Sequence, residues 1–193
     1  MEFKDSKTAG NLAKAFAGES QARNRYTYYA EVARKEGLEH VANIFEETAW
    51  NERAHAQVFY DHMIENMGPG VSYVDATYPI GESDTATNLM YAAEGEREEW
   101  EVLYKNFGDI AEEEGYKAIA VSFRNIAKVE MEHERRYLEL YELVKNEKFF
   151  ARDEEKEWKC INCGYVYVGE TPLNICPTCK YPKAFWEIKT RDH

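Results

Sequence analysis

The sequence predicts an all-α four-helix bundle over residues 1–147, followed by a linker at 148–157 and a small cysteine-bearing domain at 158–193. Three observations support this fold class. Apolar residues recur at helical spacing through long stretches without proline, the second half of the bundle repeats the first, and all four cysteines lie in the last segment. The linker is highly charged, and Phe149 and Phe150 are expected to fix its start against the bundle.

Composition and charge argue against several classes of partner. The chain carries 36 acidic against 24 basic side chains, a net charge of −12, which disfavours binding to nucleic acid or to an anionic membrane surface. Hydrophobic residues make up 44% of the chain, but no apolar run reaches the roughly 20 residues that span a bilayer. Because the first residues also lack the apolar stretch of a secretory signal, we expect a soluble cytoplasmic protein without nucleic-acid or membrane partners.

Four long helices are expected, at residues 8–36, 38–67, 85–114 and 116–146. Gly37 and Gly115 separate the members of each pair, so each pair is expected to form an antiparallel hairpin with a tight connection. The intervening segment 68–84 contains two prolines, and its residues at about 3.3 Å each could run roughly 56 Å, farther than a 28-residue helix. Two hairpins joined by one long crossover are the ferritin-like arrangement of the four-helix bundle.

The second hairpin repeats the first at a constant offset in residue number. The matched pairs include Gly37 and Gly115, Glu52 and Glu130, and His55 and His133, all at a shift of 78. Farther upstream, Glu19 matches Glu96 at a shift of 77, so the third helix holds one extra residue between its glutamate and its turn. A single inserted residue in a long helix is commonly absorbed as a π-bulge. We therefore expect a π-bulge between Glu96 and Gly115, near Glu99.

Seven polar side chains fall on the apolar faces of the predicted helices. Each continues a stripe of core residues at helical spacing, so all seven are expected to point into the bundle. Counted from the two glycine turns at 1.5 Å per residue, all lie about 22–29 Å along the bundle and form a single layer. The set consists of Glu19, Glu52, His55, Glu96, Glu99, Glu130 and His133.

Five glutamates in one apolar layer require compensating positive charge, because an unpaired buried carboxylate costs many kcal/mol and like charges add to that cost. Two divalent cations would supply +4 against −5, with neutral imidazoles completing the ligand shells. A glutamate together with Glu-x-x-His, occurring twice, is the di-iron carboxylate arrangement. These ligands suit iron or manganese, and zinc is also compatible. A chance origin of Glu-x-x-His in an acidic chain is improbable because both motifs follow the repeat.

Other acidic residues and histidines of the bundle are not assigned to this layer. Solvent-facing positions are expected for Glu46, Glu47, Glu94, Glu98, Glu132 and Glu134. We expect His40 on the surface at the start of the second helix. His62, one heptad beyond His55, is interpreted as a core or interface histidine rather than a ligand.

The C-terminal segment contains two C-x-x-C pairs separated by 12 residues. This spacing is typical of one tetrahedral thiolate metal site, here formed by Cys160, Cys163, Cys176 and Cys179. Disulfides are the competing interpretation, but clustered pairs in a chain without an export signal favour metal. Spacing alone allows structural zinc or electron-carrying iron. A small core around the site is expected from Trp158, Tyr165, Tyr167, Phe185 and Trp186.

Together these motifs make the chain resemble the rubrerythrin family over nearly its whole length. The motifs are AGES at 17–20, ERAH at 52–55, EGEREE at 94–99 and EMEH at 130–133, with the CxxCGY…CPxC tail. The resemblance implies a ferritin-like di-iron domain and a rubredoxin-like domain that holds one iron by four thiolates. It implies that the iron ligands are Glu19, Glu52, Glu96, Glu99, Glu130 and His133. It further implies that His55 replaces Glu99 on one iron upon reduction, and that Tyr26 and Tyr104 lie beside the di-iron site.

The same resemblance implies a peroxidase that reduces hydrogen peroxide to water and protects an anaerobe-type cytoplasm against oxidative stress. Electrons would originate from NADH, arrive through a separate flavoprotein or rubredoxin, and pass through the four-cysteine iron. A head-to-tail homodimer is implied as well, with one chain's four-cysteine iron near its partner's di-iron site. Two alternatives stay open: a ferroxidase or iron-storage protein of the ferritin class, and an electron carrier or zinc-stabilised scaffold without enzyme activity.

Overall fold

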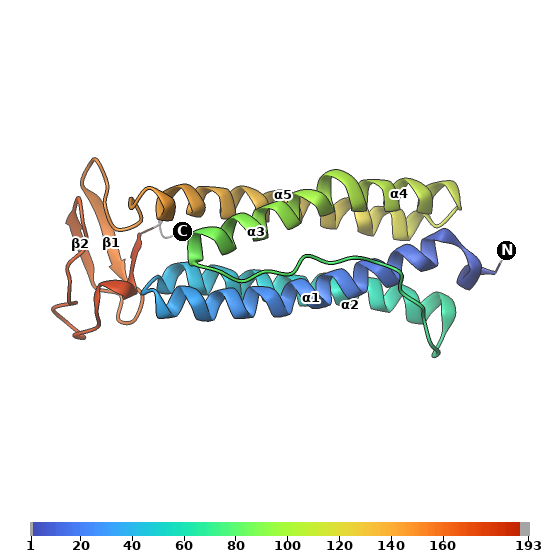
Figure 1. Ribbon diagram of the computed structural model, residues 1–193, viewed down its shortest axis with the longest axis horizontal. Helices are drawn as coiled ribbons and strands as arrows, with labels where there is room; N and C mark the ends of the chain where they lie inside the picture. Colours follow the sequence, from blue (N-terminus) through green and yellow to red (C-terminus); the bar gives the residue numbers. More distant parts are fainter. Residues whose placement is uncertain (1, 190–193) are drawn as a thin grey trace.

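In the computed structural model, which describes residues 2–189, four helical rods pack side by side along nearly their whole length (Figure 1). The first hairpin consists of α1 (Lys7–Lys35) and α2 (Glu39–Met67). The second pairs α5 (Lys117–Lys145) with a rod made of α3 (Thr85–Glu98), a π-helical segment (Glu99–Leu103) and α4 (Tyr104–Glu113). The four predicted helices are confirmed to within one residue at each end. Residues 1 and 190–193 of the predicted domains lie outside the described part of the chain.

The third rod contains the predicted π-bulge. Its signature is the N–H of Tyr104, which donates to the carbonyl oxygen of Glu99 five residues earlier. The bulge begins at Glu99. This lies between Glu96 and Gly115, where the offset in residue number between repeat-related positions changes from 77 to 78. It therefore absorbs the additional residue without breaking the rod.

Each hairpin also caps the first helix of the other. The carboxylate of Glu114 accepts from the N–H of Thr8 at 2.9 Å, and that of Glu36 accepts from the N–H of Thr85 at 3.1 Å. Both glutamates occupy repeat-related positions, and each places negative charge at the positive end of a helix. These two contacts hold the hairpins in register at opposite ends of the bundle.

The crossover at residues 68–84 runs as an extended strap along the bundle, as expected (Figure 1). The hydroxyl of Tyr29 donates to the carbonyl oxygen of Gly81 at 2.8 Å and fixes the strap against α1. Asp84 then ends the strap, because its side chain caps α3 by accepting from the N–H of Thr87 at 2.8 Å.

The apolar interior is divided into two clusters. The one nearer the C-terminal domain contains Phe45, Leu89 and Tyr137, and the other contains Leu12, Phe59 and Phe123. Between them the buried side chains are largely carboxylates and a histidine. Within residues 2–189, no helix is both long and apolar enough to cross a membrane.

The C-terminal domain is a three-stranded antiparallel sheet in the order β2-β1-β3. The strands are β1 (Lys156–Cys160), β2 (Val166–Gly169) and β3 (Trp186–Ile188). Trp158 and Trp186 form its core, with Tyr167 packed against them, as expected. Two other aromatic residues lie at the edge of this core: Tyr165 packs edge-on against Trp186 but is 38% exposed, and Phe185 packs on Tyr181.

Two contacts join this domain to the bundle. Phe149 is buried within the adjacent helical cluster, and Phe150 packs against both, which confirms the expected anchoring of the linker. His40 is not a free surface residue as expected. It is half-buried, with Nδ1 at 2.9 Å from Glu187 Oε2 of β3, because the first turn of α2 faces the small domain.

The turns of both hairpins close in the same way, and they generate a stability prediction. Gly37 and Gly115 have φ of +77° and +90°, and the next residue donates to the carbonyl five positions earlier. A Cβ at Gly115 meets no atom within 4 Å, so Gly115→Ala adds no steric clash. The substitution therefore measures only the cost of holding a residue with a side chain at positive φ. We expect a loss of about 1–2 kcal/mol. Gly10→Ala, inside α1 with equal space, should instead stabilise by roughly 0.5–1 kcal/mol.

Urea unfolding at constant metal content measures both changes. If the two substitutions shift the midpoint in the same direction, backbone conformation is not what fixes glycine at position 115.

Candidate metal centres

Six of the seven predicted donors converge at mid-bundle, from all four rods. They form two overlapping groups, in each of which the candidate ligand atoms lie within 4.8 Å of one another. One group is Glu19, Glu52, His55 and Glu130, and the other is Glu52, Glu96, Glu130 and His133. Glu52 and Glu130 are common to both groups, so each could contribute an oxygen to either group.

The two histidines show where two cations would lie. His55 Nδ1 is 2.8 Å from Glu130 Oε1, 3.0 Å from Glu52 Oε2 and 3.8 Å from Glu19 Oε2. His133 Nδ1 is 2.8 Å from Glu130 Oε2 and 3.3 Å from Glu52 Oε1. Each shared glutamate thus directs one oxygen to each histidine, so the layer contains two adjacent sets of oxygen and nitrogen donors.

Two tyrosines fix the outer glutamates. The hydroxyl of Tyr104 donates to Glu19 Oε1, and the hydroxyl of Tyr26 donates to Glu96 Oε1. Both rings are 1% exposed, and the two tyrosines themselves occupy repeat-related positions. Because Oε1 of each glutamate is occupied, the second oxygen is left free to face the centre.

The polar atoms of this layer are not satisfied by the protein alone. Among the described residues, eleven buried side-chain nitrogen and oxygen atoms lack a hydrogen-bond partner, and six of them belong to this layer. They include Glu19 Oε2, Glu96 Oε2 and His133 Nδ1. Buried carboxylates without partners are strongly unfavourable, so the donor set fits a pair of hard divalent cations.

The electrostatics of the metal-free layer lead to the same conclusion. Burial, reinforced by Glu52, raises the pKa of Glu96 to about 8. Burial opposes the charged form of His133, but the adjacent carboxylates of Glu130 and Glu52 outweigh it and raise the pKa of this imidazole to about 12. Burial also raises the pKa of Glu19 well above its usual range. Without metal, protons therefore supply the positive charge that the carboxylates require.

Metal binding should consequently release protons. At pH 7 Glu96 and His133 are protonated in the metal-free layer, because both pKa values lie above 7, and they bind metal only after losing those protons. We expect at least two protons released per iron pair, one from each of these groups, with affinity that rises between pH 6 and pH 8. Anaerobic titration of Fe²⁺ with a pH indicator, the cysteine site already filled, measures this. Glu96→Gln should release fewer protons, and pH-independent affinity would contradict the assignment.

Glu99 is the predicted donor that the structure does not bring into the layer. Its half-buried carboxylate lies beside α1, where a Cβ on Gly18 would be 3.9 Å from Oε1. Glu99 is the first residue of the π-helical segment, and it faces a cavity next to Tyr104. The single layer expected from the helical spacing therefore contains six donors, with the seventh beside it.

Sequence reasoning missed two features around the layer. Asn51 Oδ1 lies 3.3 Å from His133 Nε2, where it accepts a hydrogen bond from the Nε2–H and so favours the tautomer whose Nδ1 can bind a cation. Glu134, expected to face solvent, is instead 6% exposed. It accepts from Arg97 Nε and Trp100 Nε1, both at 2.6 Å, and so joins α5 to the π-helical segment. Trp100, an aromatic residue beside Glu99, was the available signal for this contact.

The Glu134 contact generates a second stability prediction. Glu134→Gln removes the negative charge of the carboxylate to which Arg97 and Trp100 both donate. Hydrogen bonds to charged groups contribute about 1.5–3 kcal/mol to stability. We expect a loss of about 2 kcal/mol, measured by urea unfolding of the metal-loaded protein. Glu132→Gln is the matched control, since its ion pair with Arg135 is exposed and worth less than about 1 kcal/mol. Equal losses would show that Glu134 does not fix the π-helical segment.

His62 is consistent with the structural role expected for it. Its Nε2 lies 2.8 Å from the hydroxyl of Ser122 on α5, and His62 belongs to neither donor group. This contact joins α2 to α5, which is the structural role expected for His62.

The four cysteines of the small domain form a second centre. Their sulfur atoms lie within 4.8 Å of one another, with 3.7 Å between Cys160 and Cys179 and 3.6 Å between Cys163 and Cys176. These distances exclude disulfides and match the edge of about 3.8 Å for a tetrahedron of metal–sulfur bonds near 2.3 Å. The thiols are therefore preorganised for one tetrahedral metal.

The two cysteine pairs have the same backbone geometry. Gly164 donates to the carbonyl oxygen of Cys160 at 2.8 Å, and Lys180 donates to that of Cys176 at 3.0 Å. Both donors have positive φ, +79° and +65°. Hydrogen bonds from the Asn162 side chain and the Tyr181 backbone lower the pKa of Cys179 to about 6, which favours the thiolate that binds metal.

A ferritin-like bundle with a buried carboxylate–histidine layer, followed by a four-thiolate domain, defines a dinuclear carboxylate metalloprotein with its own four-thiolate metal domain. The Rubrerythrin family profile matches residues 10–141, and the profile of its rubredoxin-like domain matches residues 158–187. The chain belongs to the rubrerythrin family. It is therefore a di-iron oxidoreductase with a di-iron site and a rubredoxin-like four-cysteine site.

Relatives match the chain over nearly its full length. Rubrerythrin-1 of Clostridium acetobutylicum is 50% identical over 192 residues, which is 99% of this chain and 98% of the relative. Rubrerythrin of Nitratidesulfovibrio vulgaris is 41% identical and covers 96% of each chain.

Solved structures agree with this fold. Nigerythrin in its fully reduced, all-ferrous state is 34% identical, with a TM-score of 0.65 over 97% of this chain and 92% of that one. Bacterioferritin of Desulfovibrio desulfuricans, 22% identical with a TM-score of 0.66 over 74% of this chain and 82% of that one, shares the bundle fold.

Proposed function

We propose that this chain reduces hydrogen peroxide to water at the di-iron layer and is re-reduced through the four-cysteine site. The observation that carries the proposal is that one chain combines a two-metal layer, an extra carboxylate beside it and a one-metal thiolate site. Two bound ferrous ions supply two electrons, the number consumed when an O–O bond is cleaved. An iron store needs neither the extra carboxylate nor the thiolate site.

The proposal assigns each donor a role. Glu52 and Glu130 would be shared by the two metals, since each directs one oxygen to each histidine. Glu19 and His55 complete one metal position, and Glu96 and His133 complete the other. Cys160, Cys163, Cys176 and Cys179 hold the single iron.

Glu99 is proposed to exchange with His55 as the iron charge changes. In the structure His55 lies among the donors and Glu99 lies outside them. This arrangement matches the ligand set proposed for the reduced state, in which His55 takes the place of Glu99. Tyr104 and Glu99 both line the cavity at the edge of the layer, and burial raises the pKa of each. They are therefore the groups able to hold a proton next to an incoming peroxide.

The proposal includes a head-to-tail homodimer. Glu52 lies 13 residues along α2 from Glu39, about 20 Å, and the four-cysteine domain lies beyond the Glu39 end (Figure 1). Within one chain an electron would have to cross more than this distance, whereas a reversed partner could bring its thiolate site next to the layer. Electrons from NADH would enter through a flavoprotein or rubredoxin in the cytoplasm, where thiols stay reduced.

Stopped-flow oxidation of the prereduced protein tests the function. Hydrogen peroxide should oxidise the di-iron site at least tenfold faster than dioxygen. Cys179→Ser should abolish turnover with an external donor but leave single-turnover oxidation within about twofold, because it removes only the re-reduction route. Thr178→Ser, in the same loop, is the matched control and should retain turnover. Comparable rates with dioxygen, or a cage-sized particle in sedimentation, would favour the ferritin-class alternative.

A further inference from the structure

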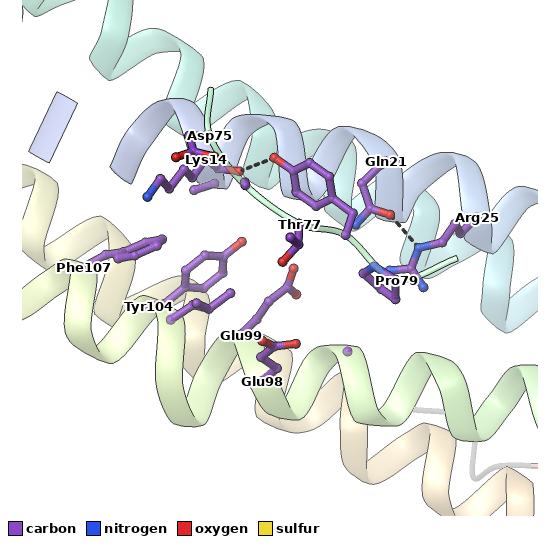
Figure 2. Close-up of a pocket in the computed structure, with 16 residues that line it drawn as sticks. Lys14, Gln21, Arg25, Asp75, Thr77, Pro79, Glu98, Glu99, Tyr104 and Phe107 are labelled. Atoms are coloured by element: carbon purple, nitrogen blue, oxygen red, sulfur yellow. Dashed lines mark hydrogen bonds between the residues drawn. The ribbon is translucent and has the colours of Figure 1, made fainter. Parts of the chain in front are cut away.

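A cavity of about 370 Å³ lies between the strap and the rods α1 and α3–α4 (Figure 2). Its inner side contains Glu99 and Tyr104, and its outer side is formed by exposed strap residues 75–79. The hydroxyl of Tyr104 donates to Glu19. The cavity is therefore separated from the di-iron layer by a single shell of side chains.

The volume of this cavity is much larger than hydrogen peroxide requires. One water occupies about 30 Å³ in the liquid, and a peroxide has only two heavy atoms. Pockets for small organic ligands begin at about 300 Å³. The space next to Glu99 thus has the size of a site for an organic molecule.

The cavity is lined by both apolar and polar side chains. This arrangement fits a molecule with one polar and one apolar end. Ala15, Leu103 and Phe107 contribute an apolar wall, while the carboxylate of Glu99 and the hydroxyl of Tyr104 are the polar groups on the side of the layer. In Figure 2, Thr77 of the strap points across the cavity toward Glu99. A ligand with its polar end at Glu99 would rest its apolar end on the ring of Phe107.

We propose that this cavity binds the organic group of an alkyl or aryl hydroperoxide, ROOH, and that the protein reduces such hydroperoxides as well as hydrogen peroxide. The inference rests on the proposed function and names a second substrate class for the same site. The O–O bond breaks, the two ferrous ions each lose one electron, and two protons are taken up. One oxygen leaves with R as the alcohol ROH and the other leaves as water, so the electron count equals that for hydrogen peroxide.

Cumene hydroperoxide, whose organic group carries one aromatic ring, is the probe for this substrate class. We expect it to oxidise the prereduced holoprotein in a single turnover and to yield one 2-phenyl-2-propanol per di-iron site. Thr77→Trp fills the cavity from the strap and should lower the ratio of the cumene hydroperoxide rate to the hydrogen peroxide rate at least tenfold. Val71→Trp, on a fully exposed strap residue outside the cavity, is the matched control and should leave that ratio within twofold.

A second variant guards against misfolding of the strap. A Cβ on Gly18 would be 3.8 Å from Tyr78 and 3.9 Å from Glu99, ordinary contact distances, so Gly18→Ala narrows the cavity without strain. It should lower the same ratio about threefold. The inference is overturned if cumene hydroperoxide leaves the wild-type iron reduced while hydrogen peroxide oxidises it, or if neither variant changes the ratio. Failure of both oxidants would instead reject the proposed function.

Binding can be measured without turnover. The product 2-phenyl-2-propanol should show NMR line broadening of its phenyl protons next to the high-spin ferrous ions of the reduced holoprotein, which the alcohol cannot oxidise. The broadening should persist in Val71→Trp and fall at least fivefold in Thr77→Trp. Equal broadening in the two tryptophan variants would show that the alcohol does not occupy this cavity.

Discussion

The burial of several carboxylates between two apolar clusters is the constraint on which the structure depends. Glu19, Glu52, Glu96 and Glu130 are all completely buried, and the protein alone leaves many of their oxygens without partners. Such a layer costs free energy unless cations or protons neutralise it. The flanking clusters, the capped helix ends and the tyrosines at the outer glutamates maintain the layer against that cost. Stability and metal binding are therefore coupled through the same side chains.

The internal repeat explains why the layer has room for two cations. Helices α2 and α5 have the same length, and the repeat matches them from their first residue to their last, so each presents a glutamate and a histidine at the same depth. Tyr26 and Tyr104 follow the same repeat and hold glutamates of the opposite hairpin. The approximate twofold relation places one donor set on each side of the carboxylates that both sets share. The four-cysteine site shows an analogous relation between its two loops.

Much of this could be predicted from the sequence. Helix limits, the strap, the π-bulge and six inward donors follow from apolar spacing and from the change of shift between the hairpins, which are local properties. The errors concern contacts between distant segments. His40 contacts the small domain, Glu134 is buried by Trp100, and Glu99 turns toward a cavity. Helical periodicity gives the face of a residue but not the partner that faces it, nor the side-chain rotation at a π-bulge.

The π-bulge has a further consequence, because it is where the two hairpins cease to be equivalent. Glu99 has no acidic counterpart in α1, where the repeat aligns it with Gln21 or, before the inserted residue, with Ala22. Duplication of an ancestral hairpin would have produced two identical halves and two indistinguishable metal positions. The additional residue in the third rod breaks that symmetry, and together with the glutamate at position 99 it gives the two positions different neighbours. A local change of helical register thus distinguishes two otherwise equivalent halves while the rods and the core keep their arrangement.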